Sequence, residues 1–397
     1  MLRPAGLLVA LTGSAIALSG WLQVWYLKNQ STGEISRETD SAEISDLRDQ
    51  LLSLEQENAV LRSLAQGGGD IPVPEDLIAF VETTLDLEFR STPVVKLSTE
   101  EGIIDAALDE LANIYGENGL SEREKVWSHI GLIPPEQALR GQFQAIATTG
   151  ARGAISADGL VMAADFDLEN VRDASALATL LGRRLVEEHM GPPPVDASDD
   201  EHWARLALRD GLAAKVTAAY RARQARMLGT LPSSPASQEA AALLESLPLF
   251  VQLVASFPAR HGLFYVESSG SDAKSLTSSP PTSSAQVMSG DKAVGDGSLG
   301  QLGLLGLLGQ SMEPAQAQEL ARSWVRDSLV YDKFSSKWEI TVSSSEAAGQ
   351  IAQAAKETLG ALFPRDEQAD LPPFMRRSWQ VRQEEALITI ENKADAS

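Results

Sequence analysis

The feature that most limits the fold of this 397-residue chain is an apolar run without a charged side chain, Ala5–Leu27. A helix of this length spans roughly 34 Å at about 1.5 Å per residue, enough to cross the hydrocarbon core of a bilayer. Trp21 and Trp25 near its end are typical of a membrane interface. We therefore predict a transmembrane anchor over residues 1–28, with a cleaved signal peptide as the alternative.

The charges beside this run indicate how the anchor is oriented. Arg3 precedes the run and Lys28 follows it, and the acidic residues after Lys28 have little influence on orientation. We expect the acidic body to be translocated, which makes the protein a single-pass membrane protein with its body outside the cytoplasm, in the periplasm.

A heptad pattern follows within residues 29–66. Seam positions recur in alternating steps of three and four, at Ile44, Leu47, Leu51, Leu54, Asn58 and Leu61. Asn58 takes an a position, where a single buried Asn favours a parallel two-stranded register. We predict a coiled-coil stalk that forms a parallel homodimer; the alternative is a solitary amphipathic helix that lies on the following domain.

The body follows a predicted Gly/Pro hinge over residues 67–74. Helical periodicity dominates residues 71–391 and short alternating segments interrupt it, so we expect an α+β fold that is predominantly helical. The expected helices are 74–84, 98–115, 124–130, 136–148, 175–190, 203–227, 237–257, 299–308, 315–323 and 346–362. The expected strands are 93–97 and 337–342, with hairpins at 154–163 and 379–391, and a Ser/Gly-rich surface loop at 268–297.

Composition excludes several classes of function. A net charge of -22 argues against a nucleic-acid partner, because such binding depends on Lys and Arg at phosphates. The absence of Cys excludes disulfides, thiolate metal ligands and a Cys nucleophile. No phosphate-binding glycine loop or serine nucleophile elbow is present, and we expect no cofactor. The only histidines are His129, His189, His202 and His261.

The helix predicted at 175–190 carries an apolar stripe with Leu177, Leu181 and Leu185, and Thr179 and Arg183 lie on a neighbouring stripe. This helix and seven other segments resemble, in order, a bacterial family of zinc metallopeptidase-like proteins. The segments are 131–140, 154–162, 176–190, 204–211, 257–266, 280–288, 299–309 and 321–327. In that gluzincin-like family the core helix bears H-E-x-x-H, a hairpin precedes it, and a second helix that begins with Glu-Gly follows it.

The resemblance implies a zincin-like body whose metal site has been lost. Thr179 and Arg183 stand where the two zinc-binding His are expected, and Leu180 stands where the general base is expected. Asp210, followed by Gly211, takes the place of the third ligand. Thr is a poor zinc ligand, Arg repels a cation and Leu cannot accept a proton. The resemblance therefore implies no catalytic residue and no bound metal.

A permanent cation at position 183 suggests a physical role. If Arg183 replaces the metal, it should form a close ion pair with Asp210 between the two helices. The alternative is that Arg183 is a solvated helix residue and Asp210 an ordinary surface acid. We expect His261 and Tyr220 to line the former substrate cleft, although His261 is equally explained as a half-buried core histidine.

We therefore expect a membrane-anchored, catalytically inactive metallopeptidase-like protein that acts by binding a peptide or protein, or as a scaffold. The first alternative is a metal-dependent hydrolase with a non-standard site built from Asp210, His189 or His202. The second is a purely structural stalk protein whose body is an inert spacer.

Overall fold

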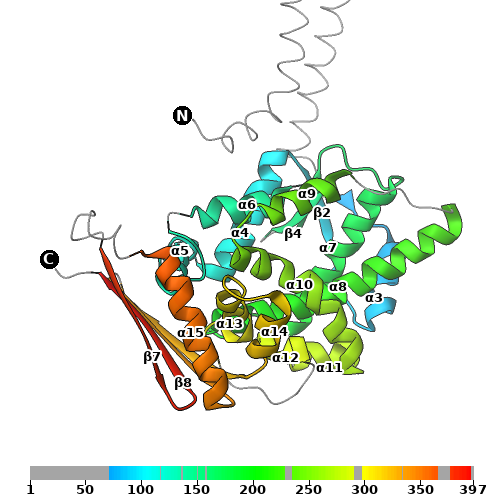
Figure 1. The fold of residues 1–397 in the computed structure, drawn as a ribbon. Coiled ribbons are helices and arrows are strands. Elements are labelled where there is room, and N and C mark those ends of the chain that lie inside the picture. The colour runs from blue at the N-terminus through cyan, green and yellow to red at the C-terminus, as the bar shows by residue number, and fades with distance from the viewer. Residues whose placement is uncertain are drawn as a thin grey trace, which may run out of the picture. The chain divides into compact units, whose positions relative to one another are not determined.

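The computed structural model describes residues 71–116, 118–135, 137–149, 151–156, 159–228, 235–289, 297–332, 334–364 and 376–394. These residues form a mixed α+β fold that is mainly helical and has two small sheets (Figure 1). The predicted membrane span and the coiled-coil seam lie outside the described residues. Within the described ranges, no helix is both long and apolar enough to cross a membrane.

The first sheet contains four short strands in the order β1-β2-β4-β3. β1 (Ile71–Pro72) pairs antiparallel with β2 (Val94–Ser98), and β2 runs parallel to β4 (Gly159–Ala163). β3 (Gly153–Ser156) pairs antiparallel with β4 and forms one edge of the sheet. The predicted hairpin over 154–163 is confirmed in its two strands; its central residues 157 and 158 are not described.

Helices cover both faces of this sheet. Ala154 and Val161 pack against Ile103 of α4 (Glu100–Tyr115), on one face. On the other face, Leu180 of α7 (Val171–Met190) lies against β3. Alternate strand residues point to opposite faces, so this short hairpin is held between two helices.

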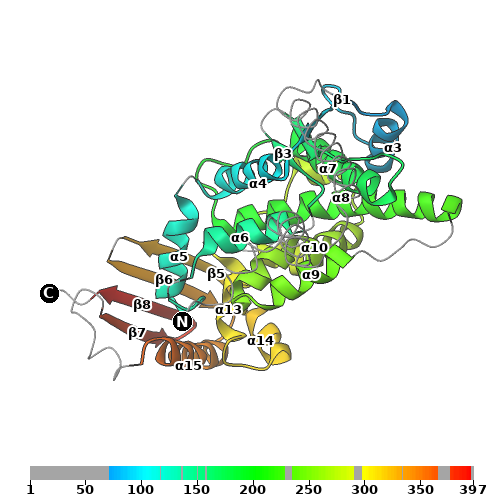
Figure 2. The ribbon, with the colours of Figure 1, turned by 90° about the horizontal axis from the view of Figure 1, so that it is seen from above.

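The second sheet is antiparallel, in the order β5-β6-β8-β7. Its strands are β5 (Trp324–Tyr331), β6 (Ser335–Val342), β7 (Arg377–Glu384) and β8 (Leu387–Ala394). Figure 2 shows these strands side by side, with α15 (Ser345–Leu362) alongside them. The predicted hairpin near the C-terminus is confirmed, whereas β5 has no counterpart among the predicted strands.

Asp327 of β5 connects the second sheet to the helical core. Its carboxylate accepts hydrogen bonds from the main-chain N–H groups of Leu299 (3.0 Å) and Gly300 (2.9 Å), at the start of α13. This helix, α13, spans Gly300–Leu308. The carboxylate also accepts from the indole N–H groups of Trp324 (3.1 Å) and Trp338 (2.8 Å). Four donors thus hold one buried carboxylate, and they come from three different elements.

α7 packs along α8 (Asp199–Leu228), α10 (Leu249–Ser269) also packs along α8, and further helices complete the body. They are α3 (Glu75–Leu85), α5 (Gly119–His129), α6 (Leu139–Thr148), α9 (Pro235–Glu245), α11 (Ala273–Ser278), α12 (Ser284–Ser289), α13 (Gly300–Leu308) and α14 (Pro314–Ala321). Trp127, Trp203 and Phe250 form an aromatic cluster between α5, α8 and α10, with ring centroids 5.0–6.0 Å apart. The core is thus built mainly by helix packing.

The prediction of one helix over 237–257 that ends at Pro258 is wrong. The chain forms α9, is interrupted near Pro248, and continues as α10, which contains Pro258 in its interior. A proline in a helix costs about 3 kcal/mol or more because it removes a hydrogen bond. Here α10 packs closely on α8 at Gly262, and this burial keeps the helix continuous beyond the proline.

The predicted surface loop over 268–297 is also wrong in its described part. It contains α11 and α12, and Val287 and Ser284 in α12 are fully buried. Two of the polar residues that suggested a loop instead cap helices: Asp272 precedes α11, and Ser283, whose Oγ accepts from Gln286 N at 3.3 Å, precedes α12. Asp272 accepts a hydrogen bond from Ser275 N (2.7 Å) and caps α11, whereas α12 begins where Ser284 N donates to Asp200 (2.9 Å).

The predicted hinge over 67–74 is only partly described. Residues 71–74 belong to the body, because Ile71–Pro72 forms β1 and Pro74 precedes α3. Residues 67–70 lie outside the described part of the chain.

Candidate functional site

The helix pair α7–α8 brings together Arg183 and Asp210, two of the residues that the sequence analysis expected at a former metal site. Asp210 lies well inside α8 rather than at its beginning, and Gly211 follows it. A Cβ on Gly211 would overlap the main-chain carbonyl of Gly262 in α10, so only glycine permits this approach of α8 to α10. This close packing against α10 sets the rotation of α8 about its axis and thereby determines which of its residues face α7.

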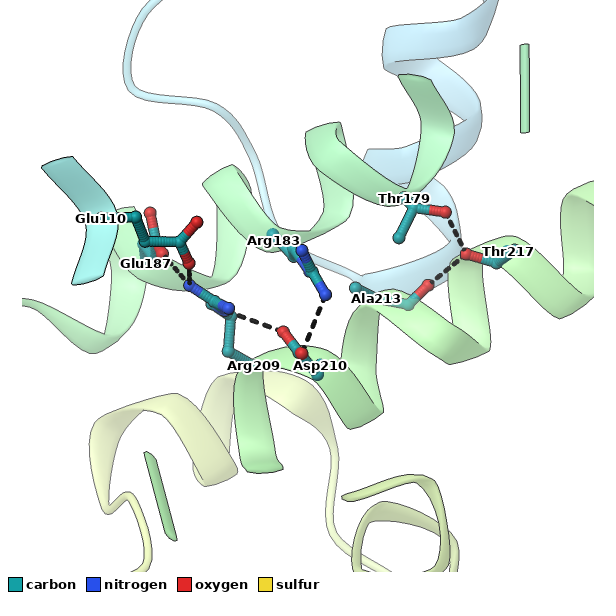
Figure 3. A network of polar contacts seen from close by, with 8 residues as sticks. All are labelled: Glu110, Thr179, Arg183, Glu187, Arg209, Asp210, Ala213 and Thr217. Carbon is teal, nitrogen blue, oxygen red and sulfur yellow. Dashed lines mark hydrogen bonds and ion pairs between the residues drawn. The ribbon is translucent and has the colours of Figure 1, made fainter. Parts of the chain in front are cut away.

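The predicted ion pair between Arg183 and Asp210 is confirmed. Arg183 Nη2 of α7 donates to Asp210 Oδ2 of α8 at 2.9 Å (Figure 3). The other oxygen of Asp210 accepts a hydrogen bond from Arg209 Nε at 2.8 Å. Both carboxylate oxygens are therefore engaged by guanidinium groups.

Arg209 extends this network to two further carboxylates. Its Nη1 donates to Glu187 Oε1 of α7 at 2.8 Å and to Glu110 Oε1 of α4 at 2.5 Å (Figure 3). The side chain of Arg209 is only 7% exposed. Two guanidinium groups and three carboxylates thus join α4, α7 and α8.

The network sets the protonation of its members. Burial alone would raise the pKa of Asp210, but Arg183 and Arg209 outweigh burial and hold its pKa below the ordinary value. Burial would likewise lower the pKa of Arg209, and the three carboxylates raise it well above its ordinary value. Asp210 is therefore ionised and Arg209 charged at neutral pH.

Thr179 and Leu180 contact neighbouring elements of the fold through hydrogen bonds and packing. Thr179 Oγ1 donates to Ser175 O (2.8 Å) and lies 2.6 Å from Thr217 Oγ1 of α8, which also bonds Ala213 O (2.9 Å). Leu180 is 5% exposed and packs on β3. Neither side chain is a base at neutral pH, because Thr179 carries a hydroxyl and Leu180 a hydrocarbon.

The two residues expected to line a cleft lie elsewhere and apart from each other. Tyr220 is 8% exposed and packs edge-on against Phe80, with ring centroids 5.7 Å apart. His261 of α10 stacks on Phe257 and lines a separate apolar pocket of about 440 Å³ between α10, α13 and α14. Burial lowers the pKa of His261. The prediction that they share one cleft is wrong.

The residues of the alternative metal site also do not meet. Nε2 of His189 lies 2.8 Å from Glu88 O, and His202 lies at a pocket wall, where burial lowers its pKa. Asp210 is already held by two arginines. In the part of the chain that the structure describes, no three His, Cys, Asp or Glu side chains gather as metal ligands would.

The sequence did not reveal Arg209 as a second partner of Asp210, or Glu110 and Glu187 as partners of Arg209. Glu187 could have been found, because it lies one helical turn beyond Arg183 on the same face of α7. Glu110 contacts Arg209 across 99 positions of sequence, and no local pattern signals such a contact.

Two pockets lie beside β3, and both are lined by α4 and α8. One contains Ser156 and has a volume of about 310 Å³; the other contains Gly153 and has a volume of about 200 Å³. Both are lined by Glu110, Ile114, Leu206 and Arg209. We call the two together the β3 groove. Arg183 lines the Gly153 pocket, so the ion-pair network lies at the wall of the groove.

A second acidic position lies apart from the groove. Asp200 at the start of α8 is fully buried; its Oδ1 accepts from Ser284 N, and its Oδ2 has no hydrogen-bond partner among the described residues. The pKa of Asp200 is raised to about 7: burial is the main cause, the side-chain and main-chain hydrogen bonds of Ser284 oppose it, and the negative charges of Asp327 and Asp199 add to it. Asp200 therefore titrates near neutral pH.

Comparison with known proteins identifies no relative: no family model, curated protein or solved structure matches the chain.

Proposed function

We propose that this chain is a membrane-tethered, catalytically inactive metallopeptidase-like protein whose body binds a peptide or an extended segment of a protein. The observation that carries the proposal is the Arg183–Asp210 pair at the wall of the β3 groove. In the alignment with zinc peptidases, this is where a metal ion would bind a ligand from each helix.

Arg183 supplies a fixed positive charge at that position. Removing a metal from such a site would leave Asp210, whose side chain is 15% exposed, with Arg209 alone to compensate its charge. A guanidinium group that donates to the carboxylate satisfies the same charge without any redox or hydrolytic chemistry. Leu180, aligned with the general base, packs on β3 and cannot activate water.

The groove itself suits an extended chain. Ala163 N donates to Arg152 O at 2.9 Å, so the hydrogen-bonded pairs of the hairpin alternate from Arg152 onward. Gly153 and Ile155 occupy the pairs in between, so their main-chain N–H and C=O groups point away from β4. An edge strand of this kind can pair with a further strand, and side chains of that strand would enter the pockets on either side.

The remainder of the proposal depends on the sequence alone. The apolar run Ala5–Leu27 supports a membrane anchor and the heptads support a parallel homodimer, which would present two grooves on one side of the membrane. The scaffold function is the second candidate, because the same stalk would hold two bodies together without any ligand.

One experiment restores the lost site. The variant Thr179→His, Leu180→Glu, Arg183→His frees Oδ2 of Asp210, while Arg209 still bonds Oδ1, and it places two imidazoles one turn apart on α7. We expect the purified full chain to contain no zinc and the triple variant to bind about one zinc ion per chain by metal analysis. Stoichiometric zinc in the wild type, or none in a folded triple variant, would contradict the assignment of the site.

A second experiment tests peptide binding directly. We expect a library of short random peptides, screened against the full chain in detergent, to yield binders. Ile114 lies in the wall that the two pockets share. Ile114→Arg should fill pocket space with its longer side chain and abolish peptide binding, and Ile114→Val should preserve it. Binders that ignore Ile114→Arg would place binding outside the β3 groove.

A further inference from the structure

The two pockets of the β3 groove meet at one ion pair. Glu110 projects from α4 and Arg209 from α8, and their side chains are 25% and 7% exposed. Both residues line both pockets. The contact between them, 2.5 Å from Glu110 Oε1 to Arg209 Nη1, therefore crosses the groove where the pockets adjoin.

Arg209 does not depend on Glu110 for its position. Its Nη1 also donates to Glu187 of α7 at 2.8 Å, and its Nε donates to the neighbouring Asp210 at 2.8 Å. Both of these partners belong to the α7–α8 pair, on the same side as Arg209. Of its three carboxylate partners, only Glu110 reaches it from α4.

We infer that Glu110 occupies the place of a ligand carboxylate, so that the β3 groove selects a peptide that presents an acidic side chain or a free C-terminal carboxylate to Arg209. This inference rests on the proposed peptide-binding function. On binding, the ligand carboxylate accepts from Arg209 Nη1 and Glu110 turns toward solvent.

The exchange explains the selectivity. A carboxylate that enters as another leaves does not change the charge of the site, and Arg209 keeps three acidic partners. A neutral peptide in the same position would displace Glu110 without replacing it and would leave the buried guanidinium short of one acceptor. A hydrogen bond to a charged group sets the expected preference at roughly ten- to a hundredfold.

The test uses the full chain and matched peptides derived from one library binder. One peptide carries a single acidic residue and an amidated C-terminus, the second replaces that acid by Gln, and the third has the Gln and a free C-terminal carboxylate. The wild type should bind the first or the third at least about tenfold more tightly than the second. Which of the two responds distinguishes a side-chain from a terminal carboxylate.

Glu110→Gln should then tighten binding of the acidic peptide by roughly tenfold, because no internal carboxylate competes for Arg209. Glu187→Gln is the matched control: it removes a carboxylate from the same Nη1 without opening the contact across the groove, and its effect should be smaller. Far-UV circular dichroism establishes that both variants fold.

The outcomes separate the two proposals. If peptides bind in the groove but all three bind equally and Glu110→Gln changes nothing, the inference is overturned and the peptide-binding function stands. If Glu187→Gln tightens binding as much as Glu110→Gln does, Glu110 is not the displaced group and the inference is again overturned. If no peptide binds to the wild type or to Glu110→Gln, the proposed function fails and the inference fails with it.

Discussion

Replacing Arg183 by Met should destabilise the body by about 2 kcal/mol, and the contacts of Asp210 set that figure. A buried carboxylate left with no partner costs about 3–5 kcal/mol. Arg209 Nε still donates to Oδ1 after the substitution, so only one charge-assisted hydrogen bond is lost, at about 1.5–3 kcal/mol. The 30% exposure of the Arg183 side chain lets solvent screen the pair, which moves the value toward the lower part of this range.

Urea unfolding of the full chain in detergent, followed by tryptophan fluorescence, measures this loss. Arg184→Met is the matched control: Arg184 pairs with Glu188 one turn away on the same helix and is 35% exposed, so its loss should cost less than about 1 kcal/mol. Asp210→Asn should cost a similar amount to Arg183→Met, and the double variant should be about 1 kcal/mol more stable than additivity predicts.

Three results would refute this reasoning. Equal effects of Arg183→Met and Arg184→Met would mean that the ion pair adds no more than a surface pair. Strict additivity in the double variant would mean that Arg183 and Asp210 do not interact. If added zinc restored the stability of the Arg183→Met variant, the site would still accept a metal.

Three further predictions concern other parts of the chain. Asp200 holds a proton in the folded state between pH 3.8 and about 7 that the unfolded chain loses, so its contribution to stability is present at low pH and lost as the pH rises. Between these limits the free energy of unfolding of the wild type should fall by about 4 kcal/mol, and Asp200→Asn should remove this fall, as measured by urea unfolding. Parallel plots of unfolding free energy against pH for variant and wild type would contradict this. Gly211→Ala should lower stability by about 3 kcal/mol because its Cβ overlaps the carbonyl of Gly262, and an unchanged denaturation midpoint would disprove that contact. Leu54→Asp should abolish dimer crosslinking and Asn58→Leu should relax its parallel register, so a crosslinking pattern unaffected by both would count against the stalk.

Much of the helical framework could be predicted because the periodicity of each helix is local. The apolar stripe of α7 fixed its buried face, and the turn between two alternating segments located the β3–β4 hairpin. The Arg183–Asp210 pair could also be predicted, because the supposed resemblance to a zinc-binding helix pair placed the two residues at facing positions. That prediction depended on the resemblance, because helix geometry and opposite charge alone do not place Asp210 beside Arg183.

The errors arise where distant contacts override local preference. Pro258 is a helix breaker by local rules, yet packing against α8 keeps it inside α10. Ser284 lies in a sequence typical of a loop, but its N–H donates to Asp200, which is 84 positions away in the sequence, and a helix begins there. The contact of Glu110 with Arg209 is of the same kind, which is why the residues that cross the groove could not be found from one sequence.

The hydrogen bonds of the Asp327 carboxylate determine which parts of the body unfold together. The N–H groups of Leu299 and Gly300 are bonded to a side chain of the second sheet, and the indoles of Trp324 and Trp338 bond the same carboxylate. In hydrogen exchange these two amides should therefore exchange only when the sheet separates from α13, at the rate of the sheet itself. The start of that helix and the C-terminal sheet then form one cooperative unit, which makes exchange at Gly300 a reporter of an event that begins in β5.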